Sequence, residues 1–156
     1  MARLSVEGSK SIYFEDLGGE GQALLMIHGW GMDNRCWDGV ILPLQAAGHR
    51  VITMDHRGCG RSDHDFEDLG IAAIAGDVTA LVDHLALSTV VLNGWSLGGA
   101  VATHAASLLG ARCVGLVLTA GASPIYTQKP DLQIGAQPAD VELSLIHISE
   151  PTRPPE

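Results

Sequence analysis

Short apolar runs that alternate with helical segments are the feature of this sequence that most limits its fold. Apolar residues run together at 23–27, 50–54, 89–94 and 113–120, as in strands buried on both faces of a sheet. Between the second and third run, residues 71–85 place apolar side chains three and four positions apart, which is typical of an amphipathic helix. Strands joined by helices of this length need right-handed crossovers and form a parallel sheet with helices on both faces. The sequence therefore predicts an α/β fold with a mostly parallel sheet.

Three further segments extend this pattern. Partial alternation at 11–18 predicts a strand, and apolar spacing predicts a second helix beginning near Leu97. Trp37, Val40, Ile41 and Leu44 also have helical spacing, but Pro43 lies among them. Because proline disturbs a helix interior, we expect that helix either to kink at Pro43 or to start close to it.

Composition excludes several classes of partner. The chain has 156 residues, 46% of them apolar, so one domain with a packed core is expected. A net charge of −9 argues against nucleic-acid and anionic-membrane binding, and no apolar run approaches the roughly 20 residues of a membrane span. The first residues carry no signal-peptide core, and the three cysteines are widely spaced. We therefore expect a cytoplasmic protein with free thiols.

The end of the chain differs from the rest. Residues 143–153, LSLIHISEPTR, resemble one reading frame of a sequencing adapter, which predicts that 143–156 is a non-native tail. The alternative is a natural proline-rich tail. On the adapter interpretation the chain is an N-terminal fragment, with 1–127 as the N-terminal part of one domain and 128–142 as the start of a lid or a linker.

Ser96 lies between two glycines at a predicted strand-to-helix junction, in the run GWSLG. A strand that turns directly into a helix forces the residue at the tip into strained backbone geometry, and only small neighbours fit beside it. The hydroxyl is then held above the sheet edge, near the positive end of the helix. The pattern predicts a nucleophile elbow with Ser96 as nucleophile and Gly94 and Gly98 as structural support. The alternative is a glycine-rich helix start capped by the serine.

A second glycine-containing loop, HGWG at 28–31, directly follows a predicted buried strand. A tetrahedral oxyanion needs two backbone N–H donors, one from the residue after the nucleophile and one from such a loop. The predicted oxyanion hole therefore consists of the backbone N–H groups of Trp30 and Leu97. For HG alone, an ordinary turn is the alternative.

Together these segments resemble the alpha/beta-hydrolase superfamily over roughly residues 11–127. HGWG with GWSLGG is similar to pimeloyl-carrier methyl-ester esterases, whereas RVITMDHRGCGRSD resembles cofactor-free haloperoxidases, arylesterases and enol-lactone hydrolases. The resemblance implies a partial alpha/beta-hydrolase fold whose C-terminal strands are missing, and a chemistry without metal or organic cofactor. It also implies supporting roles, listed here by residue: His28 and Gly29 in the oxyanion loop, and Asp55, Arg57, Gly58, Gly60 and Ser62 in the loop after the second buried strand.

A serine of this kind needs a histidine base and an acid, which follow the nucleophile in this family. After Ser96 the sequence contains only His104, in the following helix, and His147, in the adapter-like run. Asp131, Asp140 and Glu142 are assigned no role. The run DHDFED at 63–68 could hold a cation, but a solvated loop is the favoured interpretation, and no metal site is predicted.

The leading hypothesis is a serine hydrolase of carboxylic esters, thioesters or lactones that forms an acyl-enzyme with a small-molecule acyl substrate. One alternative is a cofactor-free perhydrolase or haloperoxidase, and another is a non-catalytic relative that binds a small molecule. The fragment itself is expected to be inactive. Substrate identity and oligomeric state are left open.

Overall fold

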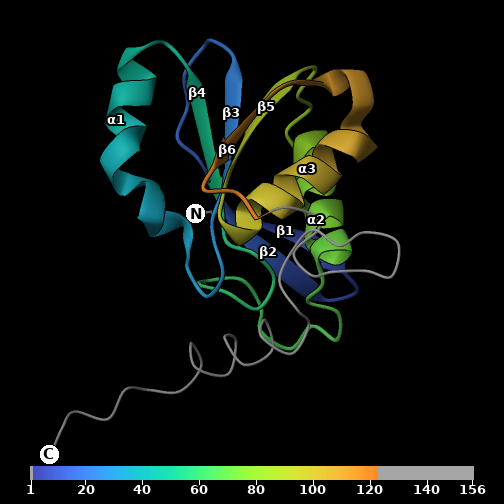
Figure 1. Ribbon diagram of the computed structural model, residues 1–156. Helices are drawn as coiled ribbons and strands as arrows, with labels where there is room; N and C mark the ends of the chain where they lie inside the picture. Colours follow the sequence, from blue (N-terminus) through green and yellow to red (C-terminus); the bar gives the residue numbers. More distant parts are fainter. Residues whose placement is uncertain (1, 123–156) are drawn as a thin grey trace, which may run out of the picture. The chain divides into compact units, whose positions relative to one another are not determined.

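A single six-stranded sheet organises residues 2–122, which are the residues that the computed structural model describes (Figure 1). The strands lie in the order β1-β2-β4-β3-β5-β6. Their bounds are β1 Ala2–Glu7, β2 Lys10–Asp16, β3 Ala23–Ile27, β4 Arg50–Met54, β5 Val90–Trp95 and β6 Cys113–Thr119. The predicted boundaries at 127 and 142 and the adapter-like segment lie outside the described residues.

The predicted parallel sheet is confirmed in its central strands. β4, β3, β5 and β6 are parallel to one another, and Leu25 of β3 lies between Ile52 of β4 and Leu92 of β5. All three side chains are fully buried. Because these strands run in one direction, their carboxyl ends meet at one edge, and the loops at 28–36 and 55–68 and the start of α3 (Leu97–Leu109) all follow strands that end there.

The other two strands are antiparallel, and the first of them was absent from the sequence-based expectation. β1 pairs with β2, and β2 pairs with β4. In β1 the odd-numbered residues are exposed, whereas Ala2, Leu4 and Val6 pack against the core. This alternation is visible in the sequence ARLSVE, so β1 could have been predicted from its period of two.

Helices cover both faces of the sheet, as predicted (Figure 1). α1 (Asp38–Ala46) lies on one face, and α2 (Ile71–His84) and α3 lie on the other; the short helical turns are η1 (Asn34–Trp37) and η2 (Gly110–Arg112). Pro43 lies inside α1, which begins five residues earlier, so the helix does not start close to Pro43. The predicted apolar stripe is only partly buried, because Val40 is 43% exposed while Trp37, in η1, is 8% exposed.

The core has two unequal parts. The larger lies between the sheet and α2 and α3, and the smaller lies under α1, where Met26, Trp37 and Val51 are buried together. Alternate residues of each central strand serve the two faces, as in β3, where Leu25 belongs to the larger cluster and Met26 to the smaller. The strands therefore read as continuous apolar runs because both of their faces are covered.

A buried ion pair fastens the loop after β4 to α2. The Arg57 guanidinium donates to the Asp77 carboxylate through Nε at 2.8 Å and Nη2 at 2.7 Å, and both side chains are at most 6% exposed. Arg57 also donates to the carbonyl oxygen of Asp68 and lies over the ring of Phe66. Arg57 thus has the structural role that was expected, with Asp77 as its buried partner. Because both charges are shielded from water, each is stabilised mainly by the other.

We predict that Asp77→Ala lowers the free energy of unfolding by about 2–3 kcal/mol, because it removes both short hydrogen bonds to the buried Arg57 guanidinium and leaves it only the more exposed ion pair with Glu7 at 3.3 Å. Asp83→Ala is the matched control. Asp83 pairs with Arg112 at 2.6 Å, but its side chain is 65% exposed, so its loss should cost less than about 1 kcal/mol. Urea denaturation of both variants measures the difference, and equal losses would contradict a special role for the buried pair.

Candidate active site

Ser96 occupies the tight junction between β5 and α3. It has φ 53° and ψ −119°, a backbone conformation that costs a non-glycine residue roughly 1–3 kcal/mol. Three backbone hydrogen bonds hold the residue there: its N–H donates to the Thr119 carbonyl at 3.0 Å, and its carbonyl accepts from Gly99 and Ala122. Ser96 stands at the N-cap position of α3 but makes no side-chain capping bond. The alternative of a capping serine is therefore not what the structure shows.

The glycines on either side of Ser96 leave no room for a side chain. A Cβ atom on Gly94 would lie 2.2 Å from the Gly98 carbonyl oxygen, and one on Gly98 would lie 2.2 Å from the Ile27 carbonyl oxygen. Both contacts are with backbone, which cannot rotate out of the way. Glycine at these positions allows α3 to start directly against the end of β3.

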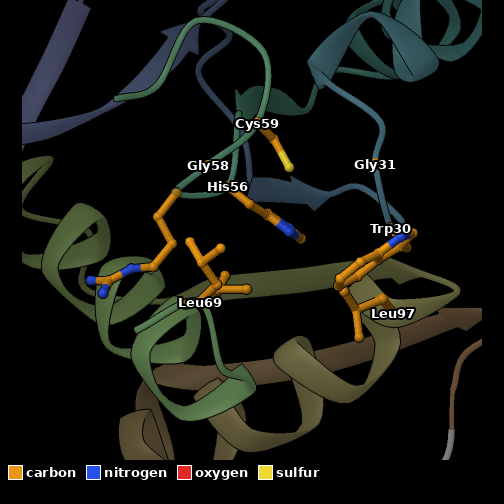
Figure 2. A pocket seen from close by; sticks show the side chains of 9 residues that line it. Trp30, Gly31, His56, Gly58, Cys59, Leu69 and Leu97 are labelled. Carbon is orange, nitrogen blue, oxygen red and sulfur yellow. The ribbon is translucent and has the colours of Figure 1, made fainter. Parts of the chain in front are cut away.

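The HGWG loop lies beside Ser96. A Cβ atom on Gly29 would come within 3.3 Å of the Ser96 Cβ, so the loop backbone and the serine are neighbours. His28 is fully buried, whereas Trp30 is 59% exposed. Trp30 and Leu97 line the same pocket, and their side chains lie next to each other in Figure 2. The structure therefore brings together the two residues whose N–H groups were predicted to bind an oxyanion.

His28 is held by backbone groups at both ring nitrogens. Its Nε2 accepts a hydrogen bond from the His56 N–H at 2.9 Å, so the proton belongs on Nδ1, which donates to the Gly29 carbonyl at 2.8 Å. The ring stacks on that of His56 with centroids 3.8 Å apart. Burial lowers the pKa of both imidazoles. His28 thus ties the HGWG loop to the loop after β4 and has no nitrogen free to act on Ser96.

The Asp55 carboxylate connects the same two loops. It is fully buried and accepts from the backbone N–H groups of Asn34 at 2.7 Å and Arg61 at 2.8 Å. Gly60 lies so close that a Cβ atom there would meet Asp55 Oδ2 at 2.3 Å. The Ser62 hydroxyl donates to the Asp55 carbonyl and accepts from the Tyr13 N–H. The contacts of the loop after β4 therefore stabilise the backbone around the site.

The expected base and acid for Ser96 are not found among residues 2–122. His104 is exposed on α3, eight residues after Ser96, which corresponds to about 12 Å along a helix. His147, Asp131, Asp140 and Glu142 lie outside the described residues. The structure therefore describes the nucleophile side of the predicted site and not its proton acceptor.

The described part of the chain contains neither a metal-binding cluster nor a membrane-spanning helix. Within it, no group of three His, Cys, Asp or Glu side chains could hold a metal ion. In the run 63–68, Asp63 instead accepts from the Ser11 N–H at 2.7 Å and pairs with Arg3. Nor is any helix of this region long and apolar enough to cross a bilayer.

A pocket of about 220 Å³ opens beside the predicted oxyanion loop (Figure 2). Its walls come from that loop, the loop after β4 and the starts of α2 and α3, with these lining residues: Trp30, Gly31, His56, Arg57, Gly58, Cys59, Leu69, Ile74 and Leu97. Sequence reasoning assigned no role to His56 or Cys59. Both residues follow β4, which ends at the edge of the sheet where ligands bind in folds of this kind. That position in the sequence could have marked them as candidates for the pocket.

We predict that Gly98→Ala disrupts the elbow, because its Cβ atom would collide with the Ile27 carbonyl. The expected loss in unfolding free energy is at least about 2 kcal/mol, as for overpacking against rigid atoms. Gly76→Ala, in the middle of α2, is the control, since nothing lies within 4 Å of that position. It should gain about 0.5–1 kcal/mol. Chemical denaturation tests both, and a tolerated Gly98→Ala would contradict the close approach.

The two stacked histidines should make stability sensitive to acid. Because burial lowers their pKa values, the unfolded chain takes up protons near pH 6.5 that the folded chain does not. Stability is then lost as pH falls below about 6.5, by up to about 1.4 kcal/mol per pH unit for each histidine. His56→Phe, which keeps the stacked ring, should reduce the difference in unfolding free energy between pH 7.5 and 5.5. An unchanged difference would mean that His56 titrates alike in both states.

Comparison with known proteins gives the family. Residues 22–142 match the model of the alpha/beta hydrolase fold. The AB hydrolase superfamily protein YisY of Bacillus subtilis is 30% identical over 152 residues, covering 97% of this chain and 56% of that protein. The pimeloyl-[acyl-carrier protein] methyl ester esterase of Photobacterium profundum is 42% identical over 108 residues, covering 69% of this chain and 40% of the esterase.

A solved structure agrees with these relatives. The bromoperoxidase from Bacillus anthracis superposes with a TM-score of 0.76 at 33% identity, covering 86% of this chain and 49% of the bromoperoxidase. The chain spans about half the length of the curated relatives it matches. With a family match over most of its length and the strand order described above, the chain belongs to the alpha/beta hydrolase family.

Proposed function

We propose that this chain carries the nucleophile and oxyanion hole of a serine hydrolase that acts on carboxylic esters, thioesters or lactones. The observation that carries the proposal is the strained Ser96 at the β5–α3 junction, with the Gly29 backbone packed against it. Strain of this kind persists only where surrounding structure enforces it, and it is common at catalytic residues. Membership of a hydrolase family with esterase relatives supports the same assignment.

In the proposed reaction, Ser96 Oγ attacks the acyl carbon and gives its proton to a base outside the described residues. The carbonyl oxygen becomes an oxyanion, which accepts hydrogen bonds from the N–H groups of Trp30 and Leu97. As the intermediate collapses, the base returns the proton to the leaving oxygen or sulfur, and an acyl group stays on Ser96. The alcohol of an ester or the thiol of a thioester departs, whereas the hydroxyl formed from a lactone remains on the acyl chain. Water then releases the acid from Ser96. Gly94, Gly98, His28 and Gly29 position these groups without contacting the substrate. No step of this scheme uses a metal or an organic cofactor.

A perhydrolase or haloperoxidase is the second candidate, and the similarity to a bromoperoxidase favours it. In that reaction hydrogen peroxide replaces water when the acyl group leaves Ser96. The same elbow and oxyanion loop serve both reactions, so competition between peroxide and water on the active protein separates them. A non-catalytic relative that binds a small molecule is the third candidate, and it requires no reactive serine.

We predict that a form extended from residue 142 through a complete hydrolase domain hydrolyses short-chain p-nitrophenyl esters, and that Ser96→Ala abolishes this activity. The 156-residue chain should show negligible turnover, because loss of the histidine alone lowers turnover by about a million-fold in an intact triad. Side-by-side assays of the three proteins measure this. Ser96-dependent turnover by the 156-residue chain would contradict the prediction that its base lies beyond this chain, and full activity of the extended Ser96→Ala variant would exclude the elbow.

A further inference from the structure

His56 is a buried side chain with a hydrogen-bonding atom that the fold leaves unused. It is 2% exposed, and its Nε2 has no hydrogen-bond partner among residues 2–122. A buried polar atom without a partner is uncommon and costly, so each case needs a physical reason. Both ring nitrogens of His28 and the carboxylate of Asp55, which lie at the same sheet edge, are hydrogen-bonded. Among residues 2–122 the other buried side-chain atoms without a partner are Trp37 Nε1 and Asn93 Oδ1, and neither residue lines the pocket beside Ser96.

The ring of His56 lies in the wall of the pocket beside the elbow. In Figure 2 its imidazole points from the loop after β4 toward Trp30 and Leu97, the two residues of the proposed oxyanion hole. Its orientation is fixed from two sides, because its N–H binds His28 and its ring stacks on the His28 ring. A group held in this way costs little further entropy when it binds a ligand.

The rest of the pocket restricts which ligand can use this nitrogen. Leu69, Ile74, Leu97 and Trp30 provide an apolar wall. Arg57 also lines the pocket, but its guanidinium is already bound to Asp77 and to the Asp68 carbonyl. Burial lowers the pKa of His56, so the ring is neutral. The pocket therefore fits a neutral aliphatic group better than a carboxylate or a phosphate.

We propose that His56 is a specificity-determining residue, which hydrogen-bonds through its free ring nitrogen to a hydroxyl group on the part of the substrate that fills this pocket. A hydroxyl fits either tautomer of a neutral imidazole because it can donate or accept. The preferred substrates are then hydroxylated aliphatic esters, thioesters or lactones rather than their unsubstituted analogues. This inference rests on the proposed function, because it treats the ligand as a substrate. Binding of the ligand does not itself require Ser96 to react.

Binding to the 156-residue chain tests this inference with ligands that are not esters. Pentanamide and its 3-, 4- and 5-hydroxy derivatives are titrated into ¹⁵N-labelled protein, and the amide signals of Gly58 and Leu97 and the ring nitrogens of His56 are followed. For at least one hydroxyl position we expect about 3- to 10-fold tighter binding than for pentanamide, the size of one net hydrogen bond. The His56 ring nitrogen signals should shift with that ligand and not with pentanamide.

Two variants at position 56 separate the hydrogen bond from the shape of the ring. His56→Phe keeps the stacked ring and should bind pentanamide and the preferred hydroxy derivative equally, whereas His56→Gln, which retains a hydrogen-bonding group, should restore part of the preference. If either variant fails to fold, the ring nitrogen shifts of the unaltered protein decide. Absence of any hydroxyl preference, a preference unchanged in His56→Phe, or unshifted His56 ring nitrogens would overturn the proposal.

Ser96→Ala keeps this test independent of the proposed hydrolysis. That variant should show the same hydroxyl preference as the unaltered chain, because the amides are bound and not cleaved. If the extended protein proves to be inactive while the preference depends on His56, the pocket is a binding site and the hydrolase proposal fails alone. If Ser96-dependent hydrolysis is found without any hydroxyl preference, the His56 proposal fails alone.

Discussion

The close approach of α3 to the end of β3 is the constraint on which the site depends. A Cβ atom on Gly98 would lie 2.2 Å from the Ile27 carbonyl oxygen and 2.5 Å from that of His28. Because these are backbone atoms at the end of a central strand and in the residue that follows it, the first turn of α3 can reach its position only with glycine at 98. That contact sets Ser96 beside Gly29, and the strain at Ser96 follows from it, since β5 must reverse into α3 within one residue.

Buried polar contacts then fix the loops that surround this junction. Neither loop is part of the sheet ladder, so each needs partners for its buried polar groups. Asp55 supplies them for the backbone of Asn34 and Arg61, His28 for the N–H of His56, and Asp77 for the guanidinium of Arg57. These contacts give the loops one arrangement, which a site requires if its donors are to be in place before the substrate binds.

Much of the fold follows from the sequence because the central strands and long helices have strong periodicity. The bounds of β3 and β4 match the apolar runs at 23–27 and 50–54, and α2 follows from its apolar stripe. β1 was overlooked although its alternation is regular. The position of Ser96 and of the HGWG loop could be predicted because glycine marks the close approaches. The pairing of Arg57 with Asp77 and the stacking of His28 on His56 could not be predicted. In each pair the two residues are far apart in the sequence, and no local sequence pattern shows that they meet.

The need to pair buried polar atoms also distinguishes the structural His28 from His56, the proposed specificity-determining residue. Both imidazoles are buried and stacked, and burial lowers the pKa of both, so neither exposure nor protonation distinguishes them. The distinction lies in their hydrogen bonds: the fold uses both ring nitrogens of His28, whereas within residues 2–122 it leaves Nε2 of His56 without a partner. An unused donor or acceptor costs stability unless something else pairs with it. In a pocket next to a strained serine, that requirement is most simply met by a hydroxyl group on a bound ligand.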